Sequence, residues 1–105
     1  MKLISSSHIL ELNVLTLLKK EDLYGYILTQ KVQEVIDISE STLYPILRKL
    51  EKKSFVETYN QEYQGRNRKY YSTTHDGEKY LLALKQEWLE FTQKINVLIG
   101  EDDEN

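Results

Sequence analysis

The chain has 105 residues, of which 30% are charged and 40% apolar, and it contains no cysteine. This length allows one domain with a single modest core, and the composition is typical of a folded, soluble protein. The lack of cysteine excludes disulfides and thiolate metal sites. Polar residues interrupt every apolar stretch long before it reaches membrane-spanning length. Polar residues near the N-terminus also argue against a signal peptide. We therefore expect a cytoplasmic protein with no membrane partner.

The net charge of −3 at first argues against a nucleic-acid partner, but the charge is unevenly distributed. The four acidic residues at 101–104 carry −4, which leaves +1 for the rest of the chain. Residues 48–69 hold seven basic and three acidic side chains, a local charge of +4. Because local rather than total charge decides phosphate binding, this segment is a candidate for a nucleic-acid contact.

Two helices are predicted in the N-terminal third of the chain. The first runs from about Ser7, a favourable N-cap residue, to Lys20. Its apolar residues cover most of its circumference, so we expect it to be buried on two sides, one of which needs a second surface. The second helix is predicted over 24–35 from an apolar stripe at helical spacing.

The third predicted helix covers Glu40 to Lys53, with Ser39 as its N-cap. Its apolar face consists of Leu43, Ile46, Leu47 and Leu50. The opposite face carries hydroxyl, phenol and basic groups, on Ser41, Tyr44, Arg48 and Lys52. Pro45 lies one turn inside this helix, where it removes one hydrogen bond, and we expect a tolerated kink.

After Ser54 the apolar period changes from helical to alternating. Residues 55–60 and 68–73 are rich in β-branched and aromatic side chains, and a polar segment separates them. We predict a β-hairpin with a seven-residue, basic-tipped loop over 61–67, in which Gly65 supplies a positive φ.

A long last helix is predicted after Thr74, its N-cap. Its apolar residues recur at steps of three and four, as in a coiled-coil seam: Leu81, Leu84, Trp88, Phe91, Ile95 and Leu98. The seam is short for a coiled coil alone, so we expect it to dimerise with help from the first helix, through Leu10, Val14 and Leu17. We assign 1–73 to a winged-helix domain, 74–99 to a dimerisation helix and 100–105 to an acidic disordered tail.

The predicted order of three helices, a hairpin and a last helix is that of a winged helix-turn-helix, a mainly helical α+β fold. A helix fits the major groove of DNA, where polar and basic side chains reach base edges and phosphates. A cationic hairpin can contact the neighbouring backbone or minor groove. The basic face of the third helix alone could equally serve solubility, but together with the basic hairpin it favours DNA binding.

The segment from Ser41 to Leu81 resembles the PadR family of transcriptional regulators. The resemblance rests on Thr42-Leu43-Tyr44-Pro45 in the third helix, on Gly65, Arg66, Arg68, Lys69, Tyr70 and Tyr71 in the wing, and on residues 74–77. Tyr24-Gly25-Tyr26 matches the start of the family's second helix, and the single helix after the wing resembles its compact subgroup. Ser54 departs from the pattern, because the family usually has glycine there. If that position is left-handed, serine costs on the order of 1 kcal/mol.

The resemblance implies a dimeric repressor without a cofactor, whose last helix packs on the first helix of the partner. It assigns DNA contacts to Ser41, Thr42, Tyr44 and Arg48 in the groove and to Gly65, Arg66, Arg68 and Lys69 in the wing. Tyr24 is a further candidate for a phosphate contact, and Lys49 is either a DNA contact or a solvated side chain. Two recognition helices of a dimer read an inverted repeat about one helical turn apart.

Trp88 has two interpretations. In some compact members of the family an interface tryptophan lines a pocket for flat aromatic compounds, which makes Trp88 a candidate ligand site for a small aromatic effector. The alternative is that Trp88, with Phe91, simply fills the dimer core.

The sequence argues against an enzyme and against a metal site. His8 and His75 are isolated, and neither a catalytic cluster nor a phosphate-binding glycine loop is present. The alternative function is a winged-helix module that binds another regulator and has no operator of its own. The low net charge and the acidic tail favour that alternative.

Overall fold

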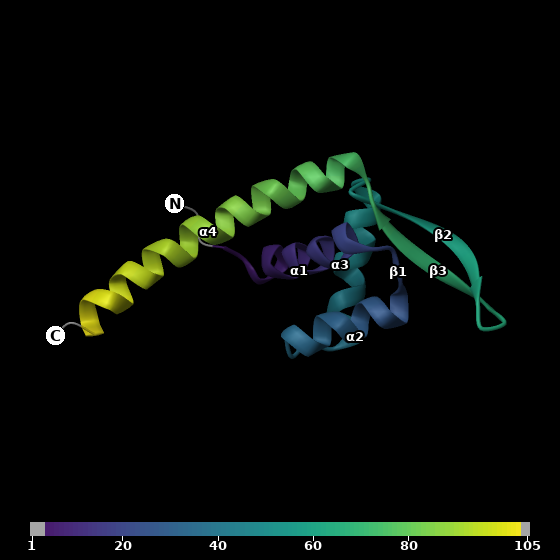
Figure 1. Cartoon of the computed structure of the whole chain (residues 1–105), viewed down its shortest axis with the longest axis horizontal. Coiled ribbons are helices and arrows are strands. Elements are labelled where there is room, and N and C mark those ends of the chain that lie inside the picture. The colour runs from purple at the N-terminus through teal and green to yellow at the C-terminus, as the bar shows by residue number, and fades with distance from the viewer. Residues whose placement is uncertain (1–3, 104–105) are drawn as a thin grey trace.

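The structure is a computed structural model that describes residues 4–103 (Figure 1). This part of the chain forms four helices and a three-stranded antiparallel sheet. In chain order the elements are α1 (Ser6–Lys20), β1 (Leu23–Tyr24), α2 (Gly25–Val35), α3 (Glu40–Lys52), β2 (Val56–Tyr63), β3 (Arg66–Thr73) and α4 (His75–Asp103). The β2–β3 hairpin projects from one end of the molecule, and the C-terminal half of α4 extends from the other. The mainly helical α+β class and the winged helix-turn-helix order are confirmed.

Serine hydroxyls begin both α1 and α3. Ser5, rather than the predicted Ser7, is the N-cap of α1, because its hydroxyl accepts a hydrogen bond from the backbone N–H three residues later at 3.1 Å. Ser39 caps α3 as predicted. Pro45 lies inside α3 without ending it, and the helix continues to Lys52.

The sheet contains one strand that was not predicted. The two residues of β1 pair with Tyr71 and Tyr70, which gives the strand order β1-β3-β2. A strand of two residues carries no alternation of apolar and polar side chains, so the sequence contains no period that could reveal it. This strand fixes the beginning of α2 to the hairpin.

The hairpin turn is tighter than predicted. Tyr63 pairs with Arg66, and only Gln64 and Gly65 connect the strands. Both connecting residues have positive φ, 53° and 77°, as a type I′ turn requires. The predicted seven-residue loop is therefore wrong, although the positive φ of Gly65 is confirmed.

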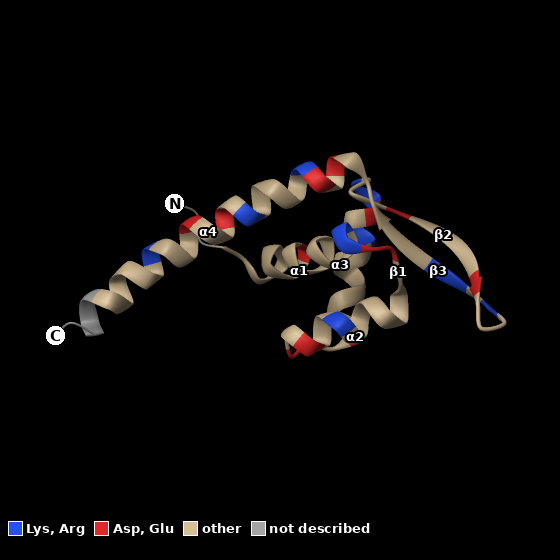
Figure 2. Ribbon diagram, in the orientation of Figure 1, with Lys and Arg blue, Asp and Glu red and all other residues tan. Residues whose placement is uncertain are grey.

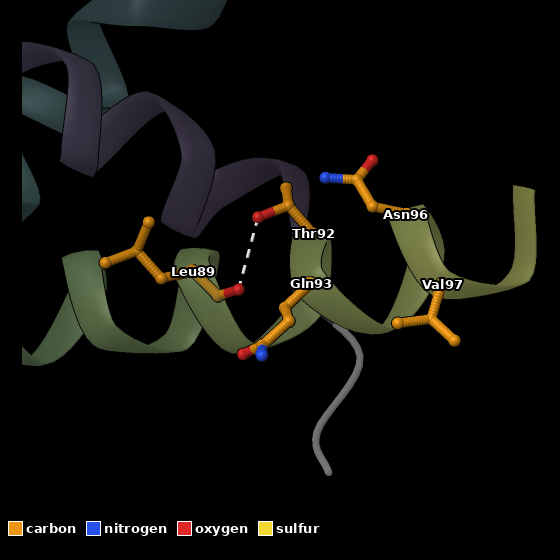
Figure 3. Close-up of a pocket in the computed structure, with 5 residues that line it drawn as sticks. All are labelled: Leu89, Thr92, Gln93, Asn96 and Val97. Atoms are coloured by element: carbon orange, nitrogen blue, oxygen red, sulfur yellow. Dashed lines mark hydrogen bonds between the residues drawn. The ribbon is translucent and has the colours of Figure 1, made fainter. Parts of the chain in front are cut away.

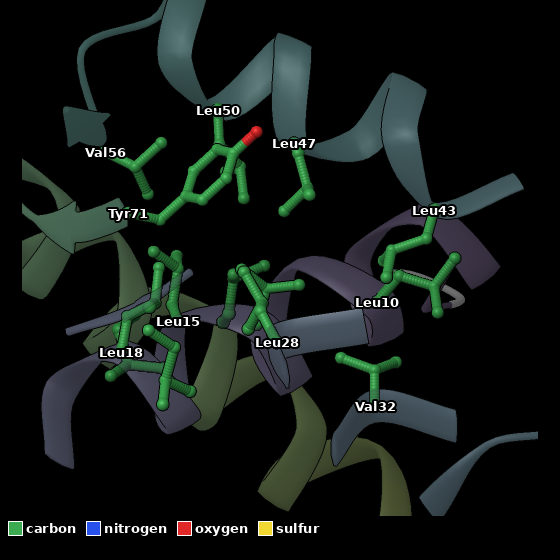
Figure 4. Close-up of a cluster of buried hydrophobic side chains, with 14 residues drawn as sticks. Leu10, Leu15, Leu18, Leu28, Val32, Leu43, Leu47, Leu50, Val56 and Tyr71 are labelled. Carbon is green, nitrogen blue, oxygen red and sulfur yellow. The ribbon is translucent and has the colours of Figure 1, made fainter. Parts of the chain in front are cut away.

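The hydrophobic core surrounds α1 (Figure 4). Helix α1 contacts α2, α3 and β3, and it also contacts the N-terminal half of α4. Its two apolar faces are therefore both covered within one chain. The buried apolar residues from the other elements are Leu23, Leu28, Val32, Leu43, Leu47, Leu50, Val56, Tyr71, Leu81 and Leu84.

Helix α4 starts on the corner between α3 and β2. The Thr74 hydroxyl accepts a hydrogen bond from the Gly77 N–H at 3.0 Å, which confirms the predicted cap, and donates one to the Ser54 carbonyl at 2.7 Å. The Thr74 N–H donates to the Phe55 carbonyl at 3.1 Å. Ser54 has φ of 62° and is left-handed. This is the conformation that would explain why the family usually has glycine at this position.

The predicted dimer seam divides into two parts. Leu81 and Leu84 of α4, together with Leu10 and Val14 of α1, are buried in the core of a single chain. Packing within one chain thus accounts for their apolar character, and their assignment to a dimer interface stays a prediction. Leu17 and Phe91 are half-buried, while Trp88, Ile95 and Leu98 are exposed.

The last turns of α4 differ from the prediction. The helix runs to Asp103, so the tail predicted to be disordered from residue 100 is helical as far as the structure describes it. The stretch after Trp88 contains no proline, and extending an existing helix costs little compared with starting one. Residues 104 and 105 lie outside the described range. Within residues 4–103, no helix is long and apolar enough to cross a membrane.

Candidate nucleic-acid interface

The outward face of α3 is polar because its inward face is filled by leucines. Leu43, Leu47 and Leu50 are 0–1% exposed, and their spacing turns the opposite side of the helix to solvent. The side chains on that side are those predicted to contact DNA: Ser41, Thr42, Tyr44 and Arg48, all exposed. A helix with such an exposed face has the size and chemistry to enter a major groove.

The hydroxyl groups at the start of α3 are held together. The Ser39 hydroxyl lies 3.0 Å from the Ser41 hydroxyl and 3.0 Å from the Thr42 hydroxyl, and it also accepts the Thr42 N–H at 3.3 Å. The capping serine therefore orients both predicted base-contacting hydroxyls before any ligand is present. Groups fixed in this way lose less conformational freedom when they bind.

The sheet carries different side chains on its two faces. Leu23, Val56 and Tyr71 point into the core, whereas the outer face carries the tyrosines Tyr24, Tyr59, Tyr63 and Tyr70. The Tyr59 and Tyr70 rings stack with centroids 5.5 Å apart, and Tyr24 lies 5.6 Å from Tyr70 and 5.9 Å from Tyr63. This tyrosine face stiffens the wing over much of its length.

Arg68 belongs to this tyrosine face. Its guanidinium carbon lies 4.5 Å from the ring centroid of Tyr24 and 5.8 Å from that of Tyr63. The Arg68 Nε is buried without a hydrogen-bond partner among the described residues. Cation–π contacts of this kind contribute about 0.5–2 kcal/mol. Arg68 therefore packs against the wing, in contrast to Arg66 beside the turn, which is exposed.

Tyr59 is also tied to the rest of the domain. Its hydroxyl donates a 2.7 Å hydrogen bond to Asp22, immediately before β1. This hydrogen bond to a carboxylate, with smaller contributions from desolvation and from the charge of Asp22, raises the pKa of Tyr59 to about 12. The Tyr59 hydroxyl therefore stays protonated at neutral pH and attaches the wing to the segment before β1.

The wing is attached to α3 by an acidic residue. Glu51 accepts a hydrogen bond from Thr58 of β2 at 3.1 Å and lies 3.6 Å from the ammonium group of Lys69 on β3. Lys69 and Glu51 are both partly exposed, so this ion pair contributes at most about 1 kcal/mol and leaves Lys69 able to exchange its partner for a phosphate.

Lys49 is not a free cation at this surface. Its ammonium nitrogen lies 3.8 Å from a carboxylate oxygen of Glu11, a fully buried residue of α1. The predicted alternative of a simply solvated lysine is therefore incomplete, because Lys49 is directed toward a buried charge. The exposed basic residues that remain on α3 and at its C-cap are Arg48, Lys52 and Lys53.

The predicted residues thus fall into two groups. Those of the first group are exposed on the third helix and at the hairpin tip, namely Ser41, Thr42, Tyr44, Arg48, Gly65 and Arg66. Those of the second group contact other parts of the protein, namely Tyr24, Lys49, Arg68 and Lys69. Figure 2 shows basic segments at the C-terminal end of α3 and in the part of β3 nearest the hairpin turn, with acidic segments on β2.

Sequence reasoning missed the acidic residues and tyrosines that position the cations. The alternation of Tyr59 and Tyr63 along one strand was a signal for the tyrosine face. For Glu11 and Glu51 the sequence offered only charges within otherwise ordinary helical patterns. Within residues 4–103, no group of three His, Cys, Asp or Glu side chains is arranged to hold a metal ion.

The C-terminal half of α4 presents a second feature, a shallow open surface on one helix (Figure 3). The apolar Leu89 and Val97 lie there among the polar Thr92, Gln93 and Asn96. All five residues come from α4, so no second element of the described chain closes this surface. Trp88, on the neighbouring face of the helix, is 36% exposed.

Comparisons with known proteins agree with this geometry. Residues 14–83 match the family described as "Transcriptional regulator PadR-like family". A crystal structure from Streptococcus mutans is 43% identical, with a TM-score of 0.87, and the alignment covers 95% of this chain and 94% of that one. A PadR-like transcriptional regulator from Bacillus cereus is 31% identical over 87% of this chain and 91% of its own, with a TM-score of 0.80. A PadR family regulator from Clostridium difficile is 30% identical over 86% of this chain and 97% of its own, with a TM-score of 0.78. The chain therefore belongs to the PadR-like family of transcriptional regulators.

Proposed function

We propose that this regulator is a dimeric repressor that acts in the cytoplasm on an inverted-repeat operator. The observation that carries the proposal is the exposed polar and basic face of α3 beside a cationic wing. Ser41, Thr42 and Tyr44 contact base edges or sugars, and Arg48 contacts base edges or phosphates. Arg66 at the wing tip contacts the neighbouring DNA backbone or minor groove, and Lys69 contributes a second positive charge on the same strand.

The first experiment measures binding of the protein to duplexes by fluorescence anisotropy as the salt concentration changes. The duplexes are the region upstream of its own gene and a scrambled sequence. If six to eight phosphates are contacted, log K falls with log salt at a slope of roughly −5 to −7. Binding without sequence preference or salt dependence contradicts the proposal and favours a module that binds another protein.

Charge-matched variants separate a local contact from a general charge effect. Arg66→Ala weakens binding to every duplex and lowers the salt slope by about 1, because one phosphate contact is lost. Lys85→Ala removes the same charge from an exposed position on α4 and leaves the affinity within about twofold. Equal losses in both variants indicate that only net charge acts. Thr42→Ala changes the base preference while leaving the salt slope unchanged.

The dimer is proposed to form through the exposed part of α4, where Trp88, Ile95 and Leu98 continue the seam. Leu98→Asp places a charge on that seam but leaves the core of the single chain intact, so the protein becomes monomeric without unfolding. Leu82→Asp is the matched control, because Leu82 is 61% exposed on the same helix but outside the seam. Sedimentation velocity decides between these outcomes, and a Leu98→Asp protein that remains dimeric contradicts the seam.

Trp88 is the proposed site for a planar aromatic effector that releases the operator. Its exposed position on the proposed dimer face supports this role, since two such rings across a two-fold axis can hold a flat molecule by offset stacking. The single tryptophan is its own reporter. Saturable fluorescence quenching at one compound per dimer supports the site, whereas linear quenching without saturation means that Trp88 only fills the interface.

A further inference from the structure

Glu11 is a buried carboxylate for which DNA binding provides no direct use. It is 0% exposed in the middle of α1, among the leucines and valines of the core. Placing a carboxylate there is costly unless partners compensate for its lost hydration. Its partners therefore indicate what the residue does.

The two oxygens of Glu11 contact different helices. Oε1 accepts a 2.9 Å hydrogen bond from the hydroxyl of Tyr80 on α4. Oε2 lies 3.8 Å from the ammonium nitrogen of Lys49 on α3 and is buried without a hydrogen-bond partner among the described residues. One carboxylate thus contacts both α3, the proposed recognition helix, and α4, the proposed dimerisation helix.

Tyr80 is a well-fixed donor in this arrangement. Its ring stacks on Phe55, at the corner between α3 and β2, with centroids 4.4 Å apart and planes 15° apart. Burial raises the pKa of Tyr80 well above its usual range, and the hydrogen bond to Glu11 and the charges of Glu11 and Glu87 add to this. Its hydroxyl is therefore protonated and able to donate at neutral pH.

A second link between α1 and α4 lacks this property. His8 lies 3.1 Å from Glu87, but both side chains are partly exposed, at 35% and 24%. Water can replace either partner there. Glu11, by contrast, is fully buried and contacts both α3 and α4 through one carboxylate.

We propose that Glu11 is a positioning residue that couples the placement of α4 to the placement of the recognition helix. A displacement of α4 that withdraws Tyr80 removes the hydrogen bond to Oε1. The buried carboxylate is then left with Lys49, and a direct charge-assisted contact near 2.8 Å requires an approach of about 1 Å. Because Lys49 follows Arg48 on α3, its approach changes how the outward face of α3 meets DNA. The inference rests on the proposed DNA-binding role of α3.

A double-mutant cycle tests this coupling. Lys49→Met and Tyr80→Phe are combined, and the Kd of each variant is measured on a duplex that the wild-type protein has selected from a randomised pool. Glu11 contacts both Lys49 and Tyr80. The Kd ratio of the double variant should therefore differ from the product of the two single-variant ratios by at least about threefold. Lys52→Met with Tyr80→Phe is the matched control, since Lys52 is exposed on the same helix, and its ratios should multiply.

The Glu11→Gln background identifies the carboxylate as the link, because the coupling between Lys49 and Tyr80 should disappear there. A structural role without coupling lowers the stability of each variant but leaves the ratios multiplicative, and that result overturns the inference. If Glu11→Gln does not fold, the Trp88 emission of wild type and Tyr80→Phe gives the second readout. Saturating duplex should shift the emission in wild type and shift it by less than half as much in Tyr80→Phe; equal shifts overturn the inference.

The DNA-binding function and the role of Glu11 can be refuted separately. If the wild-type protein binds no duplex in a salt-dependent manner, the proposed function fails and the inference fails with it. If wild type binds and the cycle is multiplicative, only the role of Glu11 is wrong.

Discussion

Replacing Gly77 by alanine should destabilise the protein, although alanine is the better helix former. Gly77 is buried in the first turn of α4. A Cβ atom there would lie 2.7 Å from the Thr73 hydroxyl oxygen and 2.9 Å from the carbonyl carbon of Phe55, and closer still to the carbonyl oxygen of Phe55. Much of this obstacle is backbone, and the same carbonyl accepts the Thr74 N–H. The chain must therefore open the corner between α3, β2 and α4.

The magnitude follows from opposing effects. Helix propensity alone favours alanine by up to about 1 kcal/mol. Overpacking a tight site costs about 1–3 kcal/mol, and loss of the hydrogen bond between Thr74 and Phe55 costs about 1 kcal/mol more. The net loss is about 1–4 kcal/mol, which corresponds to a fall in Tm of roughly 4–20 °C for a domain of this size.

Urea unfolding followed by circular dichroism measures this difference in the free energy of unfolding. Gly100→Ala is the matched control, because it lies in the same helix with no atom within 4 Å of the added Cβ. It should be as stable as wild type or more stable by up to about 1 kcal/mol. If Gly77→Ala is as stable as Gly100→Ala, the close approach at the corner is not real and the reasoning is refuted.

Three further substitutions have defined outcomes. Ser54→Gly should raise the free energy of unfolding by about 1 kcal/mol, because φ there is 62°; an unchanged urea midpoint would contradict this. Gln64→Asn should stabilise the hairpin by less than about 1 kcal/mol, measured in the same way, because asparagine before Gly65 suits a type I′ turn. The raised pKa of Tyr59 means that its neutral form contributes stability below pH 10, and this contribution is lost as the pH rises from 10 to about 12. Asp22→Asn should move that pKa toward 10 in an absorbance titration at 295 nm, and an unmoved titration curve would show that the hydrogen bond is not its cause.

The helices were predictable because their signals are local. Ser39 as a cap, the leucines of α3 and the long apolar repeat of α4 are each visible within a few turns of sequence, and α3 and α4 begin where these signals place them. The change of period after Ser54 likewise located the hairpin. These features depend on backbone geometry and on one buried face, which a single segment encodes.

The remaining features depend on partners distant in the sequence. Lys49 and Arg68 look like ordinary free cations, and only the folded chain shows the buried Glu11 beside one and the ring of Tyr24 below the other. The periodicity of Leu81 and Leu84 could not distinguish a contact with α1 of the same chain from one with a second chain. Pairing of β1 with β3 depends on contacts across more than forty residues.

The length of α4 also has a mechanical consequence. Its 29 residues span about 44 Å, and its first half is fixed on α1 by the buried Leu81 and Leu84 and by the contact between His8 and Glu87. The part after Glu87 spans about 24 Å, and if two chains join through the far ends of these helices, each acts as a lever with its pivot near Glu87. A rotation of roughly 8° at that pivot moves the far end by about 3.4 Å, the rise of one base pair. Substitutions in the packing between α1 and α4 could therefore change the preferred spacing between two operator half-sites without altering any residue that touches DNA.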